Sequence, residues 1–238
     1  MDEKQENIEK AIYAIIAMSK NDIHSLENNL EFKGVLHGIN GTCFFISSNT
    51  FITAHHCLNK TYTKDQIYFL INKNGHIING VKIDFEDSDS DMCVGKIDIS
   101  IDTYCKLSTE TLIVGGQKFT AYGFSAKDTQ NFEIKIIKEN DKIKIIKHDS
   151  LILKKVEYNY FHHFLLKNHL SSDLAPIHLI NCNVVIFDKS LELGFSGGPT
   201  FNNVTNELVG FTSQDIFYKN SENPVTIVIP VINNNEKI

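Results

Sequence analysis

The stretch TCFFISSNTFITAHHC, residues 42–57, decides the fold class. The runs TCFFISS and TFITA are rich in aromatic and β-branched residues and are separated by polar turn residues, which is typical of short β-strands. Two histidines and a cysteine, His55, His56 and Cys57, follow the second run at once. The stretch therefore indicates a β-protein and raises the question of which of these three side chains does chemistry.

Strand-like runs recur along the whole chain. Before residue 100 they are FKGVLHGI, IYFLIN, HIINGVKIDF and MCVGKIDI, and later KFTAYGF, FEIKIIKENDKIKIIK, LILKKVEY, NVVIF, LVGFTS and VTIVIPV. A looser polar stretch near 103–112 separates two groups of roughly six strands each. The sequence therefore predicts an all-β fold of two six-stranded antiparallel β-barrels packed side by side, over 31–105 and 112–238.

Helical patterns are few. Residues 5–20 predict an amphipathic helix that docks on the body, within an N-terminal helical segment 1–30. The segment YFHHFLLKNHL, 160–170, is a second candidate helix with three histidines. These histidines complete no ligand spacing nearby, so we expect surface or packing roles for them.

Composition excludes several classes of function. The 238 residues carry a formal charge of −6 and no arginine, which argues against a nucleic-acid partner. No apolar run is long enough to span a membrane, so we expect no membrane partner. The five cysteines are odd in number and irregularly spaced, which fits a reducing compartment better than a disulfide framework. We therefore expect a cytoplasmic protein.

A second stretch, LGFSGGPTF at 193–201, surrounds Ser196 with glycines and a proline. Such glycines let the backbone turn sharply and gather N–H groups at one point, as an oxyanion site requires. A Gly-rich turn with a bystander serine is the structural alternative. The segment also fits G-x-S-x-G of α/β-hydrolases, but Pro199 and a strand-like run follow it, and no histidine occurs after residue 198.

Taken together, FITAHHC, DMCVGKI and GFSGGP resemble the motifs of trypsin-like, chymotrypsin-fold serine peptidases. The resemblance covers about residues 33–231 and implies a catalytic triad of His56, Asp91 and Ser196, in the family's order along the chain. It implies that the base is His56, in a T-A-x-H-C turn, and leaves His55 as the variable neighbour. DMCVGKI departs from the family pattern only at Cys93, where a small residue is usual.

The resemblance also implies the roles of these residues in peptide-bond cleavage. His56 takes the proton of the Ser196 hydroxyl, and Asp91 holds the imidazole. The N–H groups of Gly194 and Ser196 form the oxyanion hole. Substrate-binding residues are expected at Ser190, Ser213, Gln214 and Asp215, and an acid at 215 hints at basic substrate side chains. No cofactor is implied, and the expected partner is a protein or peptide substrate.

Two metal readings compete with this one. A zinc site built on HHC is disfavoured because adjacent residues do not easily converge on one ion. Asp87, Asp89, Asp91 and Asp98 fall at positions 1, 3, 5 and 12 of an EF-hand-like loop, but Met92 replaces the required glycine. We therefore expect no metal site.

One departure from the family affects activation. Phe195 stands where zymogen-type relatives carry an aspartate that pairs with a new N-terminus, so we expect no activation by clipping. In this the chain is more similar to the bacterial or Deg-type branch. The partner position of the usual histidine-loop disulfide falls near Gly41. An unbraced oxyanion loop keeps an alternative open, in which the fold is catalytically silent or is activated by a protein partner.

Overall fold

The computed structural model describes residues 3–19, 31–35, 39–58, 66–107, 117–126, 133–139, 142–148, 151–165, 170–172, 175–179, 183–216 and 223–231. Its first half contains α1 (Glu3–Lys10), β1 (Ile12–Ser19), β2 (Glu31–Val35), β3 (Gly41–Phe45), β4 (Thr50–Ala54), the short 3-10 helix η1 (His55–Cys57), β5 (Gln66–Asn72), β6 (Ile77–Ile78), β7 (Lys82–Asp87) and β8 (Met92–Lys96). Its second half contains β9 (Lys118–Phe124), β10 (Glu133–Glu139), β11 (Lys142–His148), β12 (Leu153–Leu165), β13 (Leu170–Ser172), β14 (Ala175–Leu179), β15 (Asn183–Phe187), β16 (Pro199–Asn202), β17 (Leu208–Ile216) and β18 (Val225–Pro230).

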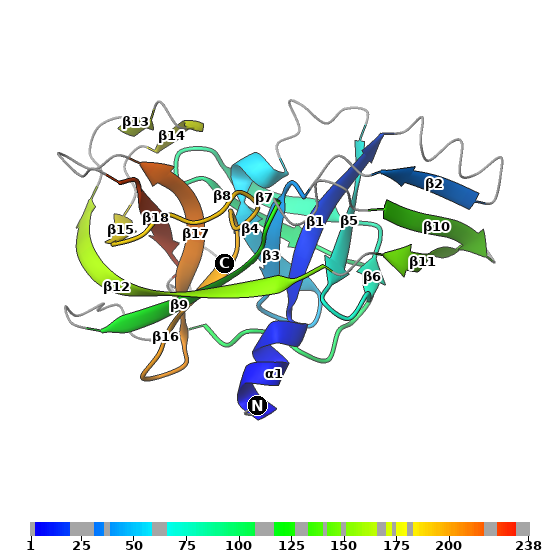
Figure 1. The fold of residues 1–238 in the computed structure, drawn as a ribbon, viewed down its shortest axis with the longest axis horizontal. Helices are drawn as coiled ribbons and strands as arrows, with labels where there is room; N and C mark the ends of the chain where they lie inside the picture. Colours follow the sequence, from blue (N-terminus) through cyan, green and yellow to red (C-terminus); the bar gives the residue numbers. More distant parts are fainter. Residues whose placement is uncertain are drawn as a thin grey trace.

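Two antiparallel β-units form the body of the molecule (Figure 1). The first is a curled seven-stranded sheet in the order β6-β5-β1-β3-β4-β8-β7. The second is a closed six-stranded barrel in the order β12-β15-β18-β17-β16-β9. The predicted all-β fold with two antiparallel units and a short N-terminal helix is therefore confirmed.

The helix predicted over 5–20 is wrong for its second half. The helix α1 ends at Lys10, and IYAIIAMS forms β1, which pairs with β3 on one side and β5 on the other. Six of its eight residues are buried, so the run is apolar on both faces of a central strand. A short continuous apolar run carries no period that separates strand from helix, and its β-branched isoleucines favour the strand.

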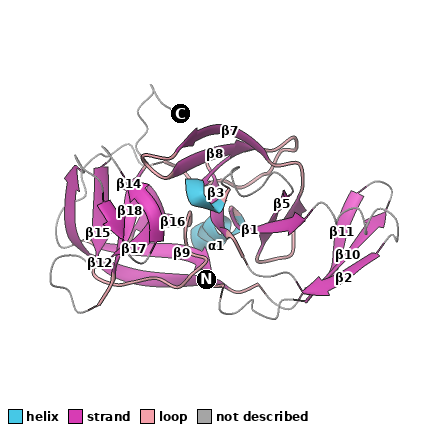
Figure 2. Ribbon diagram, turned by 90° about the horizontal axis from the view of Figure 1, so that it is seen from above, coloured by secondary structure: helices cyan, strands magenta, loops and turns pink. Residues whose placement is uncertain are grey.

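The strands of FEIKIIKENDKIKIIK also differ from the prediction in their place. They form the hairpin β10–β11 about 140–141, as the pattern indicates, but they pair with β2 in a separate three-stranded sheet. Figure 2 shows this sheet at the side of the molecule away from the closed barrel. β2 and this hairpin were assigned to different barrels, and pairing between segments about 100 residues apart leaves no local signal.

The segment 160–165 is wrong as a helix as well. It continues β12, which runs along β9 and then along β15. Residues 166–169 lie outside the described residues, as do the second half of the linker predicted at 103–112 and the cysteine at 182.

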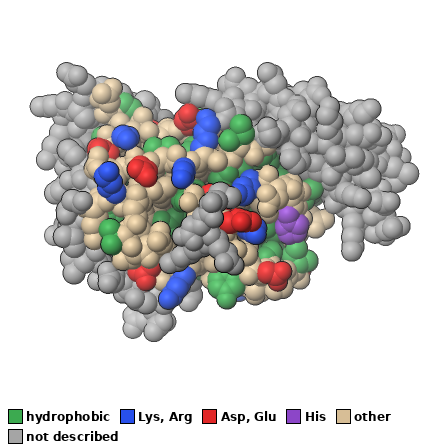
Figure 3. Space-filling model, turned by 60° about the horizontal axis from the view of Figure 1, so that its bottom comes forward, with side chains coloured by type: hydrophobic (Ala, Val, Ile, Leu, Met, Phe, Trp, Pro, Cys, Tyr) green, Lys and Arg blue, Asp and Glu red, His purple; other side chains and the backbone are tan. Residues whose placement is uncertain are grey.

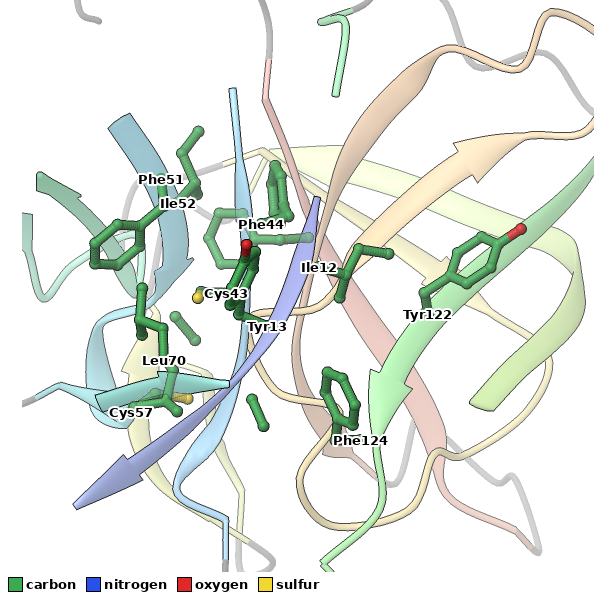
Figure 4. Packing of buried hydrophobic residues seen from close by; sticks show 14 of the residues in the cluster. Ile12, Tyr13, Cys43, Phe44, Phe51, Ile52, Cys57, Leu70, Tyr122 and Phe124 are labelled. Atoms are coloured by element: carbon green, nitrogen blue, oxygen red, sulfur yellow. The ribbon is translucent and has the colours of Figure 1, made fainter. Parts of the chain in front are cut away.

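One hydrophobic core spans both units. It contains residues of the first sheet, such as Ile12 and Phe44, together with Tyr122 and Phe124 of β9 and Ile227 of β18. Figure 4 shows side chains of both units in this cluster, with Cys57 at its edge. Because the turn after β4 ends in this core, the residue before Cys57 is held at the junction of the two units.

The surface carries mixed charge. On the face seen in Figure 3, acidic and basic side chains alternate without a large area of one sign. Among the described helices, none is long and apolar enough to cross a membrane.

Candidate active site

His56 is positioned by the end of strand β4. The chain leaves the strand at Ala54, with φ −69° and ψ 139°, and enters the single turn η1. This turn separates its three side chains: Cys57 is buried in the core, whereas the His56 side chain is 30% exposed. His55 points to another side, where its Nε2 lies 3.6 Å from Glu86 Oε2. His56 is thus the histidine that the turn presents at the junction of the two units.

Asp91 is buried beside His56. The aspartate is 1% exposed and adopts a positive φ of 51°, a strained conformation for a residue other than glycine. Both oxygens of its carboxylate lie 3.0 Å from His56 Nδ1. Oδ1 also accepts the backbone N–H of His56 at 3.1 Å. Its carbonyl accepts the N–H of His55 at 2.9 Å. The turn and the acid therefore fix one another, in backbone and side chain.

Ser213 of β17 completes the surroundings of the buried acid. Its hydroxyl donates to Asp91 Oδ2 at 2.6 Å, so the carboxylate is held from both β-units. The resemblance places Ser213 on the strand that binds the substrate backbone, and its side-chain hydroxyl is engaged by Asp91. A buried carboxylate held by this many donors keeps the imidazole in one orientation.

The surroundings of His56 set its protonation. Burial disfavours the imidazolium and lowers its pKa, while the neighbouring Cys57 sulfur and the Asp91 carboxylate raise it. The net effect raises the pKa of His56 well above its usual range. A general base must be neutral, so His56 could act as a base only as the pH rises through this elevated pKa.

Ser196 lies on a loop that is pressed against the first unit. Its carbonyl accepts the N–H of Thr42 at 2.8 Å and the Cys57 thiol at 3.5 Å. The next residue, Gly197, has φ +81°, and a Cβ there would lie 2.1 Å from Thr53 Oγ1. Only glycine allows the loop to lie this close to the first unit. The close packing places Ser196 against Cys57, the residue after His56.

The contact between the His56 turn and Ser196 is indirect. Among the described residues, no hydrogen bond joins Ser196 Oγ to His56 Nε2, although the thiol of Cys57, the residue after His56, lies 3.5 Å from the Ser196 carbonyl. Hydrogen bonds of this kind are often long in ligand-free enzymes and shorten in the substrate complex.

The turn before Ser196 has the geometry of an oxyanion site. The N–H of Phe195 donates to the carbonyl of Glu192 at 3.2 Å, with Gly194 at φ +98°, as in a type II turn. The carbonyl of Leu193 accepts the N–H of Ala126 at 2.7 Å. A trans peptide points its N–H opposite to its carbonyl, so the Gly194 N–H faces away from Ala126.

Both predicted oxyanion donors are available in this arrangement. Within the described part of the chain, neither the Gly194 N–H nor the Ser196 N–H donates to a protein acceptor. A Cβ at Gly194 would lie 2.3 Å from the Phe124 carbonyl, so the turn also requires glycine there.

Three further contacts hold this turn in place. The Thr42 hydroxyl donates to the Gly194 carbonyl at 2.7 Å and accepts the Phe124 N–H at 3.0 Å. Phe195 is 1% exposed and packs on Gly123, where a Cβ would lie 2.6 Å from its ring. Lys154 Nζ lies 2.9 Å from Glu192 Oε2. Phe195 thus anchors the turn by packing rather than by an ion pair. Sequence reasoning missed Thr42, for which the segment GTC holds no distinctive signal.

The position opposite Cys57 is filled by a glycine. A Cβ at Gly41 would lie 2.3 Å from Cys57 Sγ and 2.8 Å from the Ser196 carbonyl. Gly41 therefore does lie against Cys57, as expected for the partner position of the missing disulfide. Within the described part of the chain, Cys57, Cys43, Cys93 and Cys105 form no disulfide.

The remaining candidate substrate residues differ in their surroundings. Ser190 is exposed, while Gln214 is 6% exposed, and neither of its amide atoms has a hydrogen-bond partner among the residues that the structure describes. Asp215 accepts hydrogen bonds from Leu191 and Thr226. Of the EF-hand-like positions, Asp98 forms an ion pair with Lys82. Among the described residues, no three His, Cys, Asp or Glu side chains lie close enough together to hold a metal ion.

Comparison with solved structures gives the fold. A serine endoprotease from Yersinia pestis matches with a TM-score of 0.59 and 14% identity, over 95% of this chain and 61% of that one. The MamO protease domain from Magnetospirillum magneticum matches with a TM-score of 0.60 and 12% identity, over 95% and 94%. Deg5 matches with a TM-score of 0.55 and 16% identity, over 97% and 91%. This chain therefore spans less than two thirds of the Yersinia chain.

Sequence comparison gives the family. No curated protein matches the chain. The family model described as the trypsin-like peptidase domain matches residues 41–211, which include the histidine turn, the buried acid and the serine loop. More than half of the chain lies in this match, and the fold agrees with it. The chain belongs to the trypsin-like peptidase family.

Proposed function

We propose that the protein is a serine endopeptidase that cleaves peptide bonds through an acyl-enzyme. One observation carries the proposal: the buried Asp91 carboxylate holds His56 Nδ1 at 3.0 Å at the junction where the Ser196 loop meets the first unit. Membership of the trypsin-like peptidase family supports it.

In the first half of the reaction, Ser196 Oγ attacks the substrate carbonyl carbon and gives its proton to His56 Nε2. The carbonyl π-bond opens, and its oxygen becomes an anion that accepts the N–H groups of Gly194 and Ser196. Asp91 stabilises the imidazolium that forms. His56 then returns the proton to the leaving nitrogen as the carbon–nitrogen bond breaks, which releases an amine and leaves an ester on Ser196.

In the second half, His56 takes a proton from water as the water oxygen attacks the ester carbon. A second oxyanion forms in the same hole and collapses, the proton passes to Ser196 Oγ, and a carboxylic acid leaves. These steps use only the side chains and backbone of this chain together with water. They require no cofactor.

The edge of β17 supports an extended peptide as the substrate. The pairing of β17 with β18 joins Thr212 to Val228 and Asp215 to Thr226, so Ser213 and Gln214 between them have no ladder partner there. The pairing of β17 with β16 ends at Phe211. A backbone lying along 213–215 would place a carbonyl near Ser196, because the Thr212 carbonyl accepts the N–H of Gly197, the residue after Ser196, at 2.7 Å.

The alternative is a silent fold, or one that a protein partner activates by reshaping the oxyanion turn. The turn itself favours the active reading, since Ala126 holds the Leu193 carbonyl and Phe195 is anchored on Gly123. We therefore propose that no partner is needed for activity. The reduced thiols of Cys43, Cys57 and Cys105 support the further proposal of a reducing, cytoplasmic compartment.

Hydrolysis of a fluorescently labelled, unfolded protein such as casein tests the function. We expect the purified chain to release peptides, and Ser196→Ala and His56→Ala to lose that release while keeping the melting temperature. His55→Ala is the matched control and should remain active. Equal release by the native chain and Ser196→Ala would reject the proposal.

A further inference from the structure

The side chain next to the scissile bond has a defined neighbourhood if Ser196 is the nucleophile. The segment 190–195 leads into Ser196, and the segment 213–215 passes the acid of the triad through Ser213. With the carbonyl oxygen on the Gly194 and Ser196 N–H groups and the substrate backbone along 213–215, as proposed above, we place the residue on the N-terminal side of the scissile bond, called P1, against these two segments.

The Asp215 carboxylate bridges this space. Its Oδ2 accepts the N–H of Leu191 at 3.1 Å, which joins β17 to the loop on the opposite side. Its Oδ1 accepts the Thr226 hydroxyl at 2.7 Å, in register with the β17–β18 ladder. One side chain thus connects the loop and both strands.

A backbone hydrogen bond connects the same loop with β18. The N–H of Thr226 donates to the carbonyl of Lys189 at 3.1 Å, so the loop is tied to β18 two residues before Leu191. Ser190 lies between these two ties and is exposed rather than enclosed.

The carboxylate is held firmly in this position. Burial raises the pKa of Asp215 to about 6, against the hydrogen bonds from Thr226 and Leu191, which lower it. A long P1 side chain would have to displace the carboxylate and leave the Leu191 N–H and the Thr226 hydroxyl without their acceptor. A side chain of one to three heavy atoms requires no such displacement.

We propose that Asp215 makes the P1 pocket shallow, so that the enzyme cleaves after residues with short side chains: Gly, Ala, Ser, Cys, Thr or Val. This inference rests on the proposed peptidase function. It replaces the basic P1 preference that an acid at 215 indicated in the sequence, because both carboxylate oxygens already have donors from this chain.

A library of fluorogenic tetrapeptides that differ only at P1 tests the inference, with fluorophosphonate labelling of each protein measured in parallel. For the native chain we expect kcat/KM for Ala or Val to exceed that for Phe, Leu or Lys by at least about tenfold, the scale on which small pockets discriminate. Asp215→Gly should reverse or erase this preference. Asp215→Asn, which keeps the size and can still bridge Leu191 and Thr226, should preserve it.

The outcomes separate the two claims. A native chain that labels at Ser196 but prefers Phe, Leu or Lys overturns the shallow pocket while leaving the peptidase function intact. An Asp215→Gly variant that labels normally and keeps the short preference also overturns it. No labelling of the native chain would instead refute the proposed function. If Asp215→Gly does not fold, the native profile and Asp215→Asn still decide.

Discussion

Replacement of Thr42 by valine tests whether the oxyanion turn is held by the first β-unit. Thr42 is fully buried, and its hydroxyl donates to the Gly194 carbonyl at 2.7 Å and accepts the Phe124 N–H at 3.0 Å. Valine keeps the shape and the backbone N–H that binds the Ser196 carbonyl. It therefore removes one hydroxyl and leaves two buried backbone groups without partners.

The expected loss of stability follows from these two groups. Each unsatisfied buried backbone group costs about 1–3 kcal/mol, so unfolding should become easier by about 2–4 kcal/mol. For a chain of this size that corresponds to a fall in melting temperature of about 5–15 °C. Thr42→Ser, which retains the hydroxyl, should lose much less.

The expected loss of activity follows from the turn. A misplaced oxyanion donor costs up to about 3 kcal/mol of transition-state stabilisation, which is on the order of a hundredfold in kcat. Binding of the substrate along β17 does not involve Thr42, so KM should change little. The assay is steady-state hydrolysis below the melting range, together with the affinity of a peptide aldehyde, which resembles the tetrahedral intermediate. A folded Thr42→Val protein with native kcat and native aldehyde affinity would refute the reasoning.

Three further predictions concern the surroundings of the base. Because the pKa of His56 is raised and the neutral imidazole is the base, the rising limb of kcat/KM against pH should be centred above the ordinary histidine pKa of 6.5, and Asp91→Asn should move that limb to lower pH. A limb centred near pH 6.5 in the native chain would contradict this. Ser213→Ala removes the charge-assisted hydrogen bond of 2.6 Å to Asp91 and should lower kcat/KM, measured from initial rates, by about tenfold. An unchanged kcat/KM would contradict this role of Ser213. Gly41→Ala places a Cβ 2.3 Å from Cys57 Sγ and should lower the free energy of unfolding, measured in denaturant, by about 1–3 kcal/mol. Cys57→Ala in the same protein should restore part of this free energy. If it restores none, the predicted clash between the two side chains is contradicted.

The central motifs were predictable because each carries its own local chemistry. The turn T-A-x-H-C, the acid before a buried strand and the glycines around Ser196 each constrain a few adjacent residues. Their order and family resemblance indicated how they combine. The structure brings His56 and Asp91 to 3.0 Å.

Other features depend on partners far away in the sequence. β1 reads as a helix or a strand until β3 and β5 enclose it, and β2 joins β10 rather than its neighbours along the chain. In the sequence Thr42 looks like an ordinary strand threonine. Its role in holding the oxyanion turn depends on a hydrogen bond to Gly194, which lies 152 residues further along the chain. Likewise, Asp215 reads as a free acid until Leu191 and Thr226 supply its donors.

The position of β1 also changes how the N-terminus is tested. Because this strand lies between β3 and β5, removal of residues 1–19 would open the centre of the first sheet rather than release an inhibitory segment. Activity gained on such trimming would contradict both the fold and the anchoring of the turn by Phe195.

The most direct test of the central claim is mass spectrometry of the purified protein after reaction with a fluorophosphonate. A working triad predicts one adduct per chain, mapped to the peptide that contains Ser196, and none in His56→Ala or Ser196→Ala. The native chain should react without any added protein. An unmodified native chain, or an adduct on another residue, would contradict the assignment of His56, Asp91 and Ser196 as a formed catalytic triad.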